Sequence, residues 1–257
     1  MKPILTAVAG PLRGLLLPAL LLLAWQWASG RGASAAYVFV PLEQLWDGLR
    51  ELLASGTLAL HVGASLERAL TGLACGALLG IATGTLMAQS RIAERLVGPL
   101  FHSIRQVPLL GLVPLIALWA GSGEFAKLLI IGIAAFYPTV LNTFEGMRQV
   151  DVRYREVGAM LTLTRGQMFR HVLLPAALPA MITGVTHAQV FAWLACLGGE
   201  LLFAAAPGIG SLLQTSEQAG RMDAVLLSVL VIALLAQALN LLFTRAARLL
   251  VRGRTSQ

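Results

Sequence analysis

Six apolar stretches, each long enough to cross a bilayer, constrain the fold of this 257-residue chain more than any other feature. A bilayer core about 30 Å thick is crossed by a helix of roughly 20 apolar residues. In lipid, the backbone polar groups of such a segment must bond to one another, so the segments should be helical. The sequence predicts an all-α membrane protein with about six transmembrane helices, at about 12–30, 61–88, 98–120, 125–144, 177–205 and 223–245.

The composition agrees with a polytopic membrane protein. Hydrophobic residues make up 57% of the chain and charged residues 12%, and that charged share is about half the usual one. The net charge of +7 is also compatible with nucleic-acid binding, but basic loops that fix membrane orientation explain it better. We therefore expect contact with the lipid bilayer and no nucleic-acid partner, in a single transmembrane domain over residues 1–257.

Two of the apolar stretches have unusual features. Met1 to Gly30 has the basic start and apolar run of a signal peptide, but residues 12–29 are long enough to span, which favours a retained first helix. The stretch 98–120 contains Pro99, Pro108 and Pro114. Proline removes a helical hydrogen bond, so we expect a kink or a break there.

The distribution of basic residues predicts the orientation. With the N-terminus in the cytoplasm, thirteen of the 19 Lys and Arg residues fall on the cytoplasmic side. Cytoplasmic loops of membrane proteins carry such an excess. This asymmetry predicts that both termini are cytoplasmic.

Residues 41–56 lie between the first two apolar stretches and have their apolar residues on one helical face. We expect an external amphipathic helix on the membrane surface or against the bundle. Gly48 falls on this helix, where a larger side chain should be tolerated.

The second stretch contains a ladder of glycines four residues apart, at Gly72, Gly76, Gly80 and Gly84. Residues at this spacing share one helical face, and glycine there lets a second backbone approach closely. Tight packing within the subunit is the favoured interpretation, and a seam between subunits is the alternative.

A basic insert, "REVGAMLTLTRGQMFRHVLLPAALP", runs from Arg155 to Pro179 between apolar stretches. Its pattern predicts a first short helix from Glu156 to Leu161, with the glutamate in the first turn, and a second helix running toward Pro175. Thr164 and Gln167 match a capping box at the start of the second helix. This pair of short helices, at about 153–173, is either a docking surface for another protein or an amphipathic stretch on lipid headgroups.

The insert resembles the "EAA" loop of ABC-importer permease subunits, with the spacing from Glu156 to Pro175 intact. Thr162 stands at the glycine position of that motif. The stretches "RQVPLLGLVPLIALWAGSGE", "PTVLNTFEGMRQVD" and "GGELLFAAAPGIGSLL" resemble the nitrate/sulfonate/taurine branch of this family. Relatives often carry arginine and glycine where this chain has Thr186 and Val190, so the solute stays open.

This resemblance implies a type I ABC importer permease fold with a cytoplasmic coupling-helix insert, in the inner membrane of a bacterium. It also implies a homodimer, two ATP-binding cassette subunits that hold ATP and Mg, and a periplasmic substrate-binding protein. ATP hydrolysis would occur in the partner subunit, so this chain would be no enzyme. The expected ATPase contacts are Glu156, Val157, Gly158, Ala159, Met160, Leu161, Thr162, Thr164, Arg165 and Gly166.

Polar residues within apolar stretches are candidates for a translocation path. For a small anion such as a sulfonate, taurine or nitrate, the candidates are Thr183, His187, Gln189, Arg105 and Glu200. For each candidate, the alternative is a side chain whose polar atoms are satisfied within its own subunit. Arg105 has the further alternative of anchoring a membrane end, and Glu200 that of acting as a gate.

The sequence contains no arrangement expected of a catalytic or metal site. A self-sufficient carrier or channel is the rival class, but its acidic residues should pair near helix centres. Here the acidic residues fall near predicted helix ends. A relative that imports another solute, such as an aromatic carboxylate or a pyrimidine-type precursor, is a further alternative.

Overall fold

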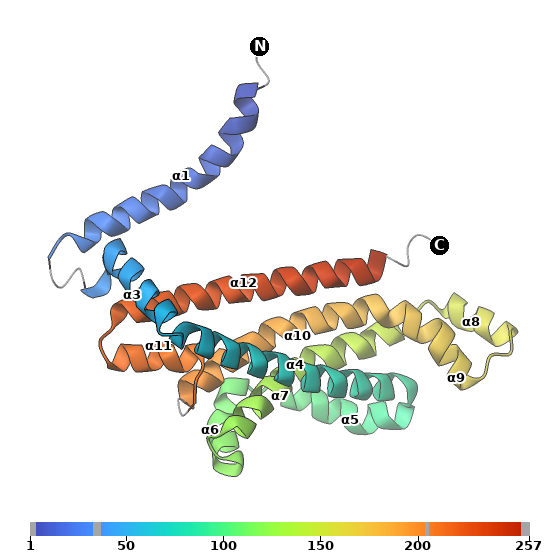
Figure 1. Ribbon diagram of the computed structural model, residues 1–257. Coiled ribbons are helices and arrows are strands. Elements are labelled where there is room, and N and C mark those ends of the chain that lie inside the picture. The colour runs from blue at the N-terminus through green and yellow to red at the C-terminus, as the bar shows by residue number, and fades with distance from the viewer. Residues whose placement is uncertain (1–3, 33–36, 204–205, 253–257) are drawn as a thin grey trace. The chain divides into compact units, whose positions relative to one another are not determined.

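A computed structural model describes the backbone of residues 4–32, 37–203 and 206–252, and the side chains of 16–32, 37–203 and 206–250. Within these residues the regular structure is helical throughout (Figure 1). The predicted all-α class is therefore confirmed. Contacts divide the chain into two units, one of residues 1–59 with 212–230 and the other of residues 60–211 with 231–257.

The first unit holds α1 (Ile4–Ser29) and α3 (Leu42–Ala54). The Trp25 indole donates to the Val40 carbonyl at 2.9 Å, and the Gln26 side chain accepts from the backbone N–H of Leu42 at 3.1 Å. These bonds fix the approach of the chain to α3. The bounds of α3 confirm the helix predicted at 41–56.

The expectation that Gly48 tolerates a larger side chain stays a prediction. Gly48 is buried, and a Cβ atom there would lie 2.6 Å from the Asp223 carboxylate. Gly48 on α3 thus lies against the start of α12 (Met222–Arg252). A helix can be amphipathic in sequence and still pack against protein over its apolar face.

Four helices in the described part are long and apolar enough to cross a membrane: α4 (Thr57–Gln89), α7 (Glu124–Arg148), the run Arg165–Leu202, and α12 over Met222–Leu250. A bent helix pair raises the number to five. In α1, the residues with described side chains, Leu16–Ser29, form a shorter apolar helix. Four of the six predicted spans therefore match single helices.

The third predicted span is a pair of helices, α5 (Arg91–Ile104) and α6 (Leu109–Ala120), bent by 101°. The expected break is confirmed, although the segment begins at Arg91 rather than residue 98. Pro99 and Pro114 lie inside the two helices. The break falls at residues 105–108, where Pro108 directly precedes α6.

The glycine ladder packs α4 directly onto α7. A Cβ atom at Gly76 would lie 2.2 Å from the Gly132 carbonyl oxygen, and one at Gly84 would lie 2.7 Å from the Val140 carbonyl oxygen. Gly72 and Gly80 meet Ile131 and Thr139 of α7 equally closely. Packing within the subunit, the favoured interpretation, is therefore confirmed.

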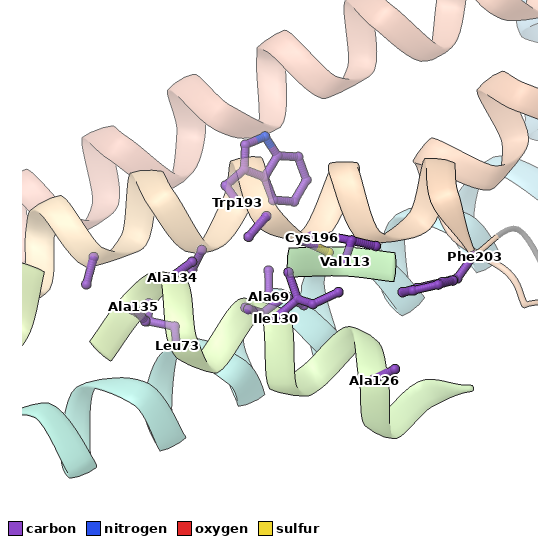
Figure 2. Packing of buried hydrophobic residues seen from close by; sticks show 14 of the residues in the cluster. Ala69, Leu73, Val113, Ala126, Ile130, Ala134, Ala135, Trp193, Cys196 and Phe203 are labelled. Carbon is purple, nitrogen blue, oxygen red and sulfur yellow. The ribbon is translucent and has the colours of Figure 1, made fainter. Parts of the chain in front are cut away.

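The core of the second unit lies between α4, α6, α7 and α10 (Leu174–Leu202). Leu73, Ile130, Val113 and Trp193 come one from each of these helices and belong to one cluster of buried residues (Figure 2). Many of its members are alanine, including Ala126, Ala135 and Ala192 at no more than 1% exposure. Small side chains let the helices approach closely, as the glycine ladder does.

The insert consists of α8 (Val152–Met160), α9 (Arg165–Met168) and a π-helix at Phe169–Leu173 that leads into α10. The second short helix therefore continues into the transmembrane helix, whereas the sequence placed the start of that span at residue 177. Proline clashes with the carbonyl four residues before it and lacks an N–H. Pro175 follows the π-helical turn, and the wider turn accommodates this defect.

Candidate functional site

The α8–α9 segment is held by capping hydrogen bonds at the start of each of its two helices. Asp151 caps α8 by accepting from the backbone N–H of Arg153 at 2.9 Å, and Arg155 donates to the Met147 carbonyl at 2.9 Å. The predicted capping box is confirmed, because Thr164 and Gln167 each accept from the other's backbone N–H. Glu156 lies in the middle of α8, so the prediction that it lies in the first turn was wrong.

The end of α8 explains why the family motif has glycine where this chain has Thr162. The N–H of Leu163 donates to the Gly158 carbonyl at 3.1 Å, and that of Thr162 to the Ala159 carbonyl at 2.9 Å. These two bonds form a Schellman motif, which places its C′ residue in the left-handed region. Thr162 has a φ of 53°, an outlying value for a β-branched residue.

Nine of the ten residues expected to contact an ATPase are exposed, and the tenth, Gly158, is buried under Met168. Exposed apolar side chains are frequent among them: Met160 is 82% exposed, Leu161 65% and Val157 54%. We call these three side chains the α8 surface. Helix α8 thus presents apolar side chains outside the membrane-spanning segments, next to charged ones.

Two of the predicted path residues line one cavity. Arg105, at the break between α5 and α6, and His187, on α10, line a cavity of about 660 Å³ that α7 closes on a third side. Both side chains are exposed within the single chain. Neither makes a hydrogen bond or ion pair with another described side chain, so both are available to a ligand.

Thr183 joins His187 in a second cavity, of about 410 Å³, between α10 and α12. Its hydroxyl donates to the Pro179 carbonyl one turn earlier. His187 therefore lies between the two cavities and lines both.

Gln189 and Glu200 lie in the interior of the chain, outside both cavities. Gln189 is 3% exposed and Glu200 0%, and neither lines either cavity. The structure therefore separates the five predicted path residues into three on cavity walls and two in the interior.

Glu200 is the centre of a buried polar cluster at the end of α10. Its carboxylate accepts from Arg68 Nη1 at 2.6 Å, from the Ser65 hydroxyl at 2.8 Å and from the Gly210 N–H at 2.9 Å. A Cβ atom at Gly208 would lie 2.4 Å from the Glu200 carboxyl carbon. The "PGIG" turn therefore needs its glycines to enclose the carboxylate.

The cluster continues to the start of α7. The Arg68 guanidinium also pairs with Glu124, whose side chain is 51% exposed, and Glu124 lies 3.4 Å from the buried Lys127 ammonium. Two cations and two carboxylates thus balance one another. The sequence analysis did not predict this cluster. A usable signal was present, because Arg68 and Glu200 are opposite charges inside apolar segments, and such charges are expected to pair.

In the part of the chain that the structure describes, no three His, Cys, Asp or Glu side chains are grouped so that they could hold a metal ion. The arrangement consists instead of an exposed apolar surface beside the membrane, a cavity with one cationic wall and a glycine-packed helical core.

Comparisons with known proteins identify the family. Residues 76–256 match the family described as "Binding-protein-dependent transport system inner membrane component". The chain belongs to this family and is a permease of the nitrate/sulfonate/taurine type, the membrane subunit of an ABC importer.

Two relatives illustrate the likeness. The chain is 33% identical to a Bacillus subtilis protein assigned as the aliphatic sulfonates transport permease SsuC, over 96% of this chain and 89% of that protein. It is also 33% identical to the taurine transport system permease protein TauC of Escherichia coli, over 72% of this chain and 67% of TauC.

The fold also matches a solved structure. A chain of the inward-facing MetNI methionine ABC transporter superposes with a TM-score of 0.66 at 19% identity, covering 76% of this chain and 96% of that one. The likeness supports the predicted type I importer permease fold.

Proposed function

We propose that two copies of this chain form the membrane channel of an importer driven by two ATP-binding cassette subunits, with α8 and α9 as their docking element. The observation that carries this proposal is the α8 surface, where Met160 and Leu161 are exposed on a well-capped segment. Large exposed apolar side chains outside the bilayer are typical of a protein contact. The partner would bind ATP and Mg and perform the hydrolysis, and this chain would couple it to transport.

The solute we propose is a small anion, such as a sulfonate, taurine or nitrate, delivered by a periplasmic binding protein. The 660 Å³ cavity supports this choice, because Arg105 at the α5–α6 break and His187 on α10 supply hydrogen-bond donors to it. An arginine matches carboxylate and sulfonate groups through its fork of donors. The permeases named for sulfonates, taurine and nitrate share the family.

Both termini and the α8–α9 segment would face the cytoplasm of a bacterial cell. The excess of basic residues on that side supports this orientation. A cysteine placed at Arg165 should react with a membrane-impermeant maleimide in inverted vesicles and stay unreacted in intact cells. Labelling of Arg165→Cys from outside intact cells would contradict the orientation.

Charge reversal at Glu156 tests the docking role. Glu156 is exposed on α8, so Glu156→Lys should leave membrane insertion and thermal stability unchanged. Against a basic group of the ATPase, the reversal should weaken the contact by roughly 2–5 kcal/mol if the pair is buried in the complex. We expect the ATPase subunit to be lost on co-purification.

Glu43→Lys is the matched control, because Glu43 is also exposed but lies on α3. It should retain the ATPase. Normal assembly and transport by Glu156→Lys would contradict the docking role, and loss of assembly in both variants would point to a general effect of charge.

A further inference from the structure

The second cavity, of about 410 Å³ between α10 and α12, has two side chains on its α12 wall that the proposed function does not use, Thr244 and Arg248. On the α10 wall, the polar lining consists of Thr183, Thr186 and His187. Among the eight described residues that line the cavity there is no aspartate or glutamate. The cavity therefore contains a permanent positive charge and no carboxylate to neutralise it.

The polar groups of the α12 wall are available to a ligand, whereas two of those on the α10 wall are not. The hydroxyls of Thr183 and Thr186 each donate to a carbonyl one turn earlier in α10, at 2.9 Å. The side chains of Thr244 and Arg248 make no hydrogen bond or ion pair with any described residue. They lie four residues apart on α12, so they share one face on successive turns. A hydroxyl and a guanidinium can therefore donate to the same anion.

The sequence of α12 places Thr244 and Arg248 at the edge of the membrane. Residues 224–244 contain no charged side chain, and roughly 20 apolar residues in a helix cross the hydrocarbon core of a bilayer. Arg245 and Arg248 are the first charges after that stretch. The polar headgroups begin where the hydrocarbon core ends, so the cavity lies at the level of the lipid phosphates.

The residues around Arg248 favour a lipid over the carboxylate of another protein as its partner. No aspartate or glutamate follows Asp223 in the chain, so the arginines at the end of α12 have no acidic neighbour in sequence. The exposed neighbours of Arg248 on α12 include Leu242 and Leu249, which are both more than half exposed. Leucines beside an arginine at this depth suit the acyl chains and the headgroup of one lipid. Basic pockets between transmembrane helices are known to bind the headgroups of anionic lipids.

We propose that this cavity binds the phosphate of an anionic phospholipid, with Arg248 and Thr244 as its donors and the apolar part of the lipid against Pro179 and Ile182. The site goes beyond the proposed function, because it needs neither the ATPase nor the transported solute. The proposed orientation places it in the cytoplasmic leaflet. A lipid bound there would join α12 to α10, which continues the helical run that begins at Arg165 in the docking element.

The test is native mass spectrometry of the full chain, purified in a mild detergent together with any subunit that co-purifies. The probes are phosphatidylglycerol, which is anionic, and phosphatidylcholine with the same acyl chains, which carries no net charge. We expect the wild type to bind phosphatidylglycerol about tenfold more tightly. Thermal denaturation of the same samples should show that phosphatidylglycerol raises the Tm and that inorganic phosphate does not, because phosphate lacks the acyl chains.

Three variants test whether the binding belongs to this cavity. Arg248→Gln should weaken phosphatidylglycerol by about tenfold, because a hydrogen bond to a charged group is lost. Arg245→Gln is the matched control: Arg245 is also exposed near the end of α12 but does not line the cavity, so its loss should leave binding unchanged. Thr244→Val removes only the hydroxyl and should weaken binding by about threefold. All three variants should denature like the wild type in phosphatidylcholine, which shows that they fold.

Equal losses of phosphatidylglycerol in Arg248→Gln and Arg245→Gln would overturn the inference, because the basic end of α12 would then attract lipid without a defined site. Equal binding of the two lipids by the wild type would overturn it as well, and so would an equal rise in Tm with inorganic phosphate. If Arg248→Gln kept its lipid but lost an ATPase or a second copy of the chain in the same spectra, the occupant would be a protein and the lipid site would be rejected. The proposed function is judged separately, by whether the wild type retains its ATPase.

Discussion

The two ends of α10 differ in how their side chains are satisfied. At the C-terminal end, the Glu200 carboxylate is completely enclosed and accepts hydrogen bonds from Arg68, Ser65 and Gly210. The N-terminal end leads back into α9 and α8, where Met160 is 82% exposed (Figure 1). One end is complete within the chain, and the other displays apolar side chains that nothing described in this chain covers.

Stability should therefore depend on the enclosed end of α10, and ATPase assembly on the exposed end. Substitutions at the enclosed end leave a buried group without its partners, which is among the costliest changes in a protein. Substitutions on the α8 surface remove little that the single chain uses. The two ends should therefore respond in opposite ways when stability and ATPase assembly are measured in the same variants.

The largest effect is expected at the buried cluster. Glu200→Ala removes a partner of Arg68 and leaves that guanidinium with only the half-exposed Glu124. Breaking a buried ion pair in this way typically costs about 3–5 kcal/mol. Thermal denaturation in detergent should show a large fall in Tm, or no folded protein at all.

The exposed pair Glu94–Arg148 is the control for this prediction. Exposed ion pairs contribute about 0–1 kcal/mol, so Glu94→Ala should denature close to the wild type. Equal Tm values for the two variants would mean that the enclosed end of α10 is no more critical than the surface.

A smaller but still clear loss is expected on the glycine ladder. Gly76→Leu places a side chain where even a Cβ atom would lie 2.2 Å from the Gly132 carbonyl oxygen, and overpacking typically costs about 1–3 kcal/mol. Gly63 lies on the same helix with nothing within 4 Å of its Cβ position, so Gly63→Leu should be mild. A Tm for Gly76→Leu equal to that of Gly63→Leu would refute close packing of α4 on α7.

The sequence predicted features that depend on local pattern. Helix spans, the glycine ladder and the Thr164–Gln167 capping box all follow from residues near one another in the chain, and the structure has each of them. The bounds were less well predicted where a proline lies within a continuous helix. The break expected in the stretch 98–120 falls before Pro108, whereas Pro99 and Pro114 lie inside helices. Pro175, toward which the second insert helix was expected to run, lies in the first turn of α10.

Features that depend on distant residues could not be predicted. The partner of Glu200 is 132 residues away, and no local pattern indicates that distance. The sequence argument against a self-sufficient carrier placed the acidic residues near helix ends, and Glu200 does lie near the end of α10, although it is buried and paired. Family membership, rather than that argument, identifies the class of protein.

The next effect is expected at the exposed end of α10, where relief of backbone strain at Thr162 should stabilise the turn after α8. Thr162 has a φ of 53°, and such strain costs on the order of 1–3 kcal/mol. Glycine adopts this conformation freely but loses more chain entropy on folding, so Thr162→Gly should stabilise the turn by roughly 1 kcal/mol.

Hydrogen exchange measures this gain locally. The Leu163 amide, which donates to the Gly158 carbonyl, should exchange roughly fivefold more slowly in Thr162→Gly. Thr162→Ala keeps a Cβ atom at positive φ and should not show the gain. Faster exchange in the glycine variant would show that the threonine is not strained there.

The smallest effect is expected at the exposed pair of Glu51, on α3, with Arg221. Both guanidinium Nη atoms donate to the carboxylate at 2.8 Å. The hydrogen bonds from Arg221, and then its charge, lower the pKa of Glu51 from its ordinary value of 4.5. A lowered carboxyl pKa contributes stability that is present above the ordinary value and is lost as the pH falls through the lowered one. Glu51→Gln should therefore melt slightly below the wild type at pH 7, and the two Tm values should converge as the pH falls below about 4.5.

Asp47→Asn removes a charge from the same helix, at a side chain for which no ion pair is found among the described residues, and should show no such convergence. A Glu51→Gln deficit that persists at low pH would mean that the side chain acts through packing rather than through its charge.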